Sequence, residues 1–74
     1  MSRPNQSEIA KRFGKNLQSV MKNLDLTGAS LSEKTGLTPA AISQILSGKR
    51  EPLLSTVIRI MNVIPVSFER LTRP

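Results

Sequence analysis

The sequence predicts a single all-α domain of five helices, and three observations lead to this prediction. The chain has 74 residues, which is enough for one small hydrophobic core. Apolar residues recur at spacings of three and four, as they do on the buried face of a helix. Residues that begin or end helices separate these segments, and no segment carries the signal of a strand.

The first helix is expected to follow a polar segment, residues 1–6, which we interpret as a flexible arm because it is polar and contains Pro4. Ser7 is the expected N-cap. Gly14 lies inside the helix, where it either permits a close approach of a second helix or is a tolerated defect that costs about 1 kcal/mol. The spacing predicts one buried stripe of this helix, formed by Ile9, Phe13, Leu17, Val20, Met21 and Leu24.

Two short helices follow, each with its own start and stop signals. Thr27 is a suitable N-cap for the second helix, which is expected to end at about residue 35, before Gly36. A glycine there suits the left-handed residue that often ends a helix. The third helix is expected to begin after Thr38, with Pro39 in its first turn, and to end before Gly48.

The fourth helix is expected from about Leu54 to Ile64, before Pro65, and a last helical turn follows the N-cap Ser67. The fourth helix contains more apolar residues than one buried face needs. Its few basic residues argue against a membrane-active strip. The surplus therefore predicts a homodimer interface, although the same residues also suit the closing of a small core. The residues expected at the interface are Val63, Val66, Phe68 and Leu71.

Composition and charge restrict the classes of function. Eleven Lys and Arg against five Asp and Glu give a net charge of +6, which favours a polyanionic partner, nucleic acid first and an anionic membrane surface second. The chain has no Cys and no His, so it lacks thiolate ligands, the usual zinc ligand and the usual general base. Its carboxylates are scattered, and no nucleotide-binding motif is present. We therefore expect no enzyme, cofactor, metal or small-molecule ligand.

The most informative segment is residues 28–47, which predict a helix, a tight turn and a second helix. Leu31 is expected to face inward, Ser32 is small enough for two helices to cross closely, and Gly36 permits the turn. The shared core would be completed by Leu37, Ile42 and Ile45. Such a helix-turn-helix leaves the outer face of its second helix free to enter a major groove of DNA.

The residues of this segment resemble the Cro/C1-type helix-turn-helix family, the five-helix DNA-binding domain of lambdoid phage repressors and their plasmid and bacterial relatives. The resemblance rests on LSEKTGLT at 31–38, AISQI at 41–45 and SGKREP at 47–52, and it covers about residues 17–71. It implies a lambda-repressor-like fold over residues 7–74. It also implies a cytoplasmic repressor of phage or plasmid type that binds a palindromic operator in double-stranded DNA as a homodimer.

The same resemblance assigns two sets of site residues. The base-reading positions are Ala40, Ala41, Ser43 and Gln44. Gln44 is the strongest candidate among them, since a Gln amide bonds both N6 and N7 of adenine. The phosphate-binding positions are Thr38, Ser47, Lys49, Arg50 and Gly28, and Arg3 in the arm adds a further contact.

The chain departs from the family pattern at three places. Gly28 stands where a Gln often contacts phosphate, so that a contact there must come from the backbone N–H or be absent. Met21 and Leu46 stand where many members have an Arg and an acidic partner, which predicts apolar packing instead. Pro39 and the two alanines after it make the reading face sparse, which favours recognition through DNA shape.

Three other readings stay open at this stage. The chain is alternatively an antitoxin that represses its own operon and binds a toxin. It is alternatively a protein-interaction module that kept the fold without specific DNA binding, for which the bare Pro39-Ala40-Ala41 start is the argument. It is also possible to read the 74 residues as a headpiece of a longer repressor.

Overall fold

The structure, a computed structural model, describes residues 5–74 and is all-helical in this range, without a β-strand. Five helices follow one another: α1 (Gln6–Asn23), α2 (Gly28–Thr35), α3 (Pro39–Leu46), α4 (Leu54–Val63) and α5 (Phe68–Thr72). The predicted fold class is therefore confirmed. Residues 1–4 of the predicted arm, Arg3 included, lie outside the described residues. None of the five helices has both the length and the apolar character needed to cross a bilayer.

Side chains cap four of the helices, three of them as predicted. Thr27, Thr38 and Ser67 each accept a hydrogen bond from the backbone N–H three residues further on, over 3.1, 3.1 and 3.2 Å. The cap of α1 differs from the prediction, because Asn5 and not Ser7 accepts the N–H of Glu8, over 2.8 Å. Both residue types cap helices well. The earlier cap starts α1 at Gln6, so the helix includes the last residue assigned to the arm.

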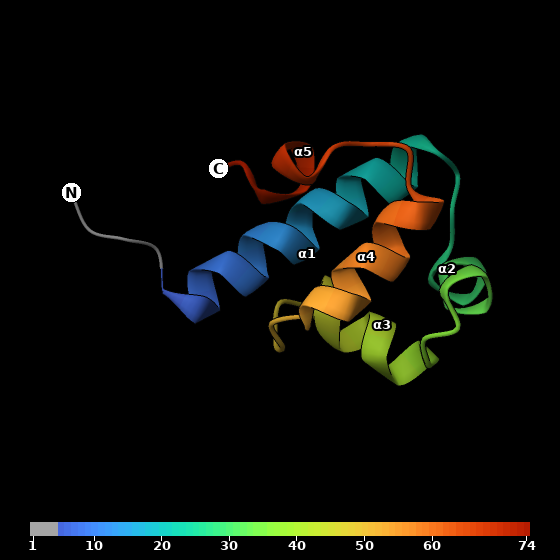
Figure 1. The fold of residues 1–74 in the computed structure, drawn as a ribbon, viewed down its shortest axis with the longest axis horizontal. Coiled ribbons are helices and arrows are strands. Elements are labelled where there is room, and N and C mark those ends of the chain that lie inside the picture. The colour runs from blue at the N-terminus through green and yellow to red at the C-terminus, as the bar shows by residue number, and fades with distance from the viewer. Residues whose placement is uncertain (1–4) are drawn as a thin grey trace.

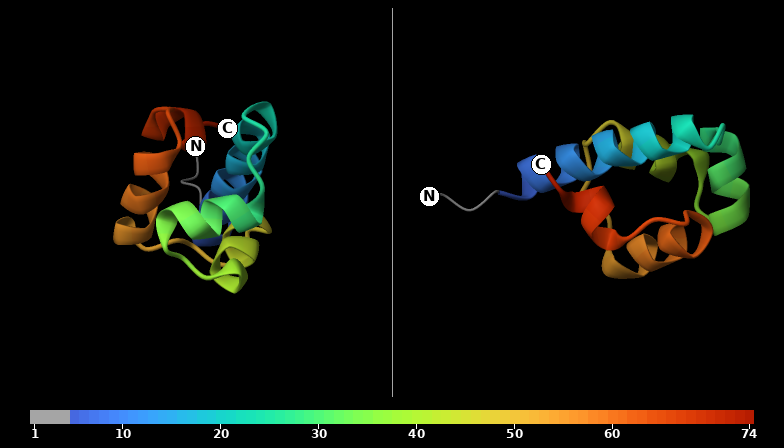
Figure 2. Two further views of the ribbon diagram at one scale, coloured as in Figure 1. Left: turned by 90° about the vertical axis from the view of Figure 1, so that its right-hand side faces the viewer. Right: turned by 90° about the horizontal axis from the view of Figure 1, so that it is seen from above.

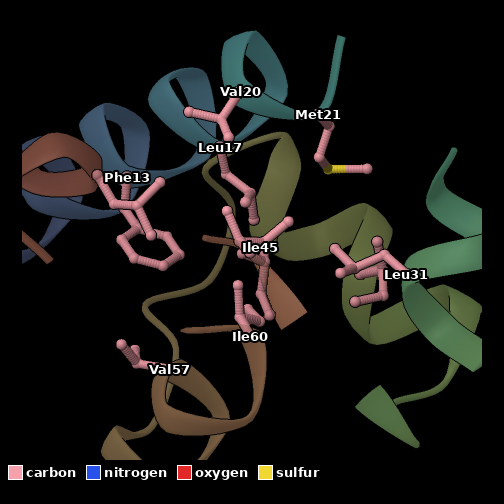
Figure 3. Close-up of a cluster of buried hydrophobic side chains, with 11 residues drawn as sticks. Phe13, Leu17, Val20, Met21, Leu31, Ile45, Val57 and Ile60 are labelled. Carbon is pink, nitrogen blue, oxygen red and sulfur yellow. The ribbon is translucent and has the colours of Figure 1, made fainter. Parts of the chain in front are cut away.

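The core lies where the five helices meet, and Figure 3 labels part of it. Phe13, Leu17, Val20 and Met21 of α1 face Ile45 of α3, Leu31 of α2, and Val57 and Ile60 of α4. The predicted buried face of α1 is buried in its middle, from Phe13 to Met21, but not at its two ends. Leu24 is 46% exposed, because it follows the last residue of α1, and Ile9 is half-buried. Phe13 is the aromatic member of this core, and the other members are aliphatic residues and Met21.

Helix α1 is the longest element and holds α3 and α5 on different sides of itself (Figure 1). Toward α3, a Cβ added at Gly14 would lie 2.7 Å from the carbonyl oxygen of Leu46 and closer still to that of Ile45. Gly14 therefore permits the close crossing that the sequence left open. Toward α5, the Asn16 amide donates to the carbonyl oxygens of Leu71 and Arg73, over 3.0 and 2.8 Å.

Candidate nucleic-acid interface

The turn between α2 and α3 is fixed by hydrogen bonds that two side chains of α2 make. Gly36 ends α2 with φ of 77°, in the left-handed region predicted for it. The Ser32 hydroxyl donates to the Leu37 carbonyl. The Thr35 hydroxyl donates to the Leu31 carbonyl over 2.7 Å and accepts the N–H of Leu37 over 3.3 Å. These bonds fix the turn that leads from α2 into α3, and the left view of Figure 2 shows the two helices crossing.

Thr35, for which the sequence predicted no role, is a buried polar residue with three hydrogen-bond partners. Its hydroxyl returns to the carbonyl four residues earlier, a common bond for a Thr inside a helix. A Thr in the last turn of a short helix, directly before the turn glycine, is the signal that would have found it.

Helix α3 has one buried side and one exposed side. Ile42 and Ile45 face the core and are each 2% exposed. On the opposite side Ala40, Ser43 and Gln44 are exposed. Ala41 is half-buried, so it presents less surface than the other three predicted base-reading residues. The exposed side of α3 therefore offers one amide, one hydroxyl and a methyl group to a partner.

The predicted phosphate-binding residues surround α3 at both of its ends. Thr38 is exposed at its start, where its hydroxyl already accepts the N–H of Ala41. Ser47 follows its last turn, and its hydroxyl donates to the Gln44 carbonyl over 3.1 Å. Lys49 and Arg50 are both exposed in the turn toward α4. The position of Arg3 lies outside the described residues.

A surface depression of about 420 Å³ brings distant parts of the sequence together beside α3. Gly28, the first residue of α2, Ser43 of α3 and Ser47, which directly follows α3, all line it. Two predicted phosphate-binding positions, 28 and 47, therefore share one site. A helix start carries unpaired N–H groups and a partial positive charge, so the edge of the depression at Gly28 attracts an anionic group, although apolar side chains such as Ile42 and Leu46 form much of the rest of the lining.

Gln18 of α1, which was not among the predicted site residues, lines the same depression. Its amide donates to the carbonyl of Leu46 over 3.1 Å and so ties α1 to the end of α3. Met21 is buried, and Leu46 packs against the apolar cluster that contains it. Where many family members have a charged pair, this chain thus has apolar packing, as expected, together with a Gln-to-backbone hydrogen bond.

The second notable surface is apolar. Among the described residues, four large apolar side chains are more than half exposed, and we call them together the apolar patch: Leu53, Leu54, Ile58 and Phe68. Leu54 and Phe68 border a groove of about 270 Å³ that also contacts Phe13. Leu53 occupies the N-cap of α4 and makes no side-chain cap bond, an unfavourable choice for the helix itself. An apolar residue at a helix N-cap was therefore the signal in the sequence that could have predicted this exposed apolar surface.

The four residues predicted for a dimer interface differ in how much surface they expose, and the dimer itself stays a prediction. Leu71 is fully buried in the monomer core, so it has no surface to offer a partner. Val63 and Val66 are half-buried and pack against the core. Phe68 alone of the four predicted residues belongs to the apolar patch.

Two helices locked across a tight turn, the second with its outer side exposed, define a helix-turn-helix unit of DNA-binding proteins. Residues 17–71, most of the chain, match the family described as Helix-turn-helix. The chain belongs to this family, and specifically to its Cro/C1 type, as the sequence resemblance indicated.

A curated relative is similar over most of this chain. It is a protein of Bacillus subtilis (strain 168), named an uncharacterized HTH-type transcriptional regulator, YqaE. The two are 34% identical over 61 residues, which make up 82% of this chain and 53% of the relative. The chain thus spans about half the length of that relative. No solved structure matches the chain.

Proposed function

We propose that this protein is a transcriptional regulator that binds duplex DNA sequence-specifically as a homodimer and represses transcription from a palindromic operator of phage or plasmid type. The proposal rests on one observation, which is that α3 has one buried side and one exposed side. Its inner side is fixed in the core by Ile42 and Ile45, and its outer side presents Ala40, Ser43 and Gln44. An exposed recognition helix on a rigid support is what insertion into a major groove requires.

Gln44 has the chemistry for direct base reading in this proposal. Its amide donates to and accepts from the edge of an adenine, which discriminates against other bases by about 1–3 kcal/mol. Ser43 is a weaker hydrogen-bonding neighbour, and the methyl group of Ala40 suits a thymine methyl. Ala41 is half-buried and therefore presents less of its methyl group to a base than Ala40 does.

Contacts to the DNA backbone orient α3 in the groove. The start of α2 at Gly28 contacts a phosphate in the depression that Ser47 also lines, and the Ser47 hydroxyl rotates away from the Gln44 carbonyl to donate to the same phosphate. Thr38 contacts a phosphate at the start of α3, and Lys49 and Arg50 contact others beyond its end. The net charge of +6 draws the whole domain to DNA.

The apolar patch is the surface through which two copies pair in this proposal. Pairing would cover Leu53, Leu54, Ile58 and Phe68, which water surrounds in the monomer. A symmetric dimer places two α3 helices in successive major grooves, and half-sites about one helical turn apart follow from that arrangement. The proposed mechanism of repression is occupation of a promoter that overlaps the operator, by binding alone.

Selection of bound duplexes from a random DNA library at near-physiological salt tests the proposal. We expect enrichment of an inverted repeat whose half-sites lie about 10 base pairs apart. Enrichment of a single half-site would contradict the dimer but keep sequence reading. Binding without any enrichment would contradict sequence reading, and the apolar patch would then be examined for a protein partner such as a toxin.

A further inference from the structure

Helix α1 carries a stripe of exposed polar residues along the side that borders α3. Lys11, Lys15, Gln18 and Lys22 follow one another at spacings of four, three and four, which places them on one face of the helix. All four are exposed, and we call them the α1 stripe. Lys11 and Lys15 precede residue 17, where the match to the family begins.

Contacts to α3 and to the turn after it fix the position of this stripe. A Cβ added at Gly48 would lie 2.8 Å from the Cα of Lys11 and 2.9 Å from its Cγ, so this turn packs directly on the stem of Lys11. Lys49 and Arg50 come next in the chain and are exposed. Glu51, at the end of the same turn, lies instead at the groove beside Ile9.

The middle of the stripe is fixed equally well. Gln18 donates to the Leu46 carbonyl and lines the depression that Ser43 and Ser47 also line. Lys15 lies on the stripe between Lys11 and Gln18, one helical turn from each. The stripe therefore runs beside the end of the recognition helix, between the depression and the basic turn.

The needs of the helix itself account for Lys22 and in part for Lys11, but not for Lys15, because Glu8 is three residues before Lys11, a favourable spacing, and seven before Lys15. Lys22 is in the last turn of α1, where a positive charge interacts favourably with the helix dipole. Lys11 and Lys15 are in the interior, four residues apart, and like charges at this spacing repel. The single carboxylate of α1, Glu8, lies in its first turn.

We propose that Lys11 and Lys15 bind phosphates of the DNA backbone that flank the half-site, and that they form one cationic surface with Lys49 and Arg50. The proposal rests on the DNA binding proposed above and adds a second segment of DNA to its footprint. From Lys11 to Lys22 the stripe is about 16 Å long, and each DNA strand carries a phosphate about every 3.4 Å along the duplex axis. The stripe is thus long enough to contact several phosphates.

The test is the salt dependence of DNA binding by Lys11→Ala/Lys15→Ala. Each lost phosphate contact lowers the slope of log affinity against log salt by about 0.9. On a duplex with a single half-site, which one protomer binds, we expect a slope lower by about two units, so that between 50 and 200 mM salt the wild type loses about tenfold more affinity than the variant. A dimer on a full operator loses twice as many contacts, and its slope is expected to fall by about four units. Preference among base sequences stays the same. On the half-site duplex, Lys49→Ala calibrates the assay with a slope lower by about one unit.

Lys34→Ala/Arg73→Ala is the matched control, because it removes the same charge from exposed positions at the end of α2 and after α5. Its slope is expected to equal that of the wild type. Circular dichroism confirms that each variant is folded. A second readout is duplex length: trimming the flanking base pairs weakens the wild type and leaves the Lys11→Ala/Lys15→Ala variant unchanged.

Two outcomes separate this inference from the proposed function. If the wild type binds DNA and the double variant has an unchanged slope, the α1 stripe makes no phosphate contact and the inference is overturned alone. If the wild type binds no duplex at any salt concentration, the proposed function and this inference are overturned together.

Discussion

Gln44 is the residue whose proposed role is most specific, because it is the exposed amide on the outer side of α3. Gln44→Ala removes both hydrogen bonds to the expected adenine and should abolish preference at one base pair in each half-site, a loss of about 1–3 kcal/mol in discrimination. Binding to the selected operator and to its single-base variants measures this. The control is Asn62→Ala, which removes an exposed amide from α4. If Gln44→Ala kept the full preference at every position, Gln44 would have no reading role.

Two opposing effects decide how Gly14→Ala changes the stability of the protein. Replacing a helical Gly by Ala normally stabilises a helix by up to about 1 kcal/mol. At Gly14, however, the added methyl group would meet the backbone carbonyls of Ile45 and Leu46, which no side-chain rotation can move away. We expect Gly14→Ala to lower the free energy of unfolding by about 1–3 kcal/mol, as overpacking does.

Gly28→Ala supplies the matched control for that experiment. A Cβ at Gly28 would meet only Ile42 Cγ2 within 4 Å, at an ordinary contact distance of 3.8 Å. We therefore expect equal or slightly higher stability for Gly28→Ala in urea unfolding, with a gain below about 1 kcal/mol. Equal stability of the two variants would mean that α1 and α3 separate easily.

At the scale of the elements, the attachment of α5 to α1 depends on Asn16. Its amide donates to two carbonyl oxygens at the end of α5. Asn16→Ala removes both bonds and is expected to cost about 1 kcal/mol. Asn16→Asp should cost more, about 2 kcal/mol, because a carboxylate cannot donate and instead directs negative charge at the same oxygens. Urea unfolding compares the two variants, and an aspartate variant as stable as the alanine one would contradict this account.

The elements also show which features local sequence can predict. The caps Thr27, Thr38 and Ser67 were predictable, since each bond joins residues three apart. The cap of α1 was not, because Asn5 and Ser7 are both good caps and the choice depends on how far the helix extends. Bonds such as that from Asn16 to Leu71, 55 residues apart, depend on the assembled fold.

In the candidate site, too, some features were predictable from local sequence and others depend on the assembled fold. The exposed side of α3 was predictable from its helical period, given the buried Ile42 and Ile45. The meeting of Gly28, Ser47 and Gln18 in one depression required the crossing angles of three helices. The dimer residues were predicted from apolar content alone, which cannot distinguish a buried Leu71 from an exposed Phe68.

At the scale of the whole molecule, the expected assembly is a dimer that pairs through the apolar patch. Leu54→Ser/Phe68→Ser removes two exposed apolar side chains while the monomer core is left in place. Each loss is expected to weaken pairing by about 1–2 kcal/mol, or roughly tenfold in the dimer dissociation constant. Sedimentation equilibrium over a range of protein concentrations measures the change.

DNA binding supplies a second measurement of the same assembly. The double variant should bind the full operator more weakly than the wild type and a single half-site equally well. Leu24→Ser is the control, because Leu24 is exposed and apolar but lies after α1, outside the apolar patch. A double variant that sediments like the wild type would remove the apolar patch from the dimer interface.

The separation of the two sides of α3 has a consequence for evolution. Stability depends on the inner side, where Ile42 and Ile45 are buried, whereas Ala40, Ser43 and Gln44 contribute no core contact. Substitutions at such surface positions usually change stability by no more than about 0.5 kcal/mol. If the outer side of α3 reads bases as proposed, preference for a DNA sequence can therefore diverge between descendants of this domain while the scaffold stays the same.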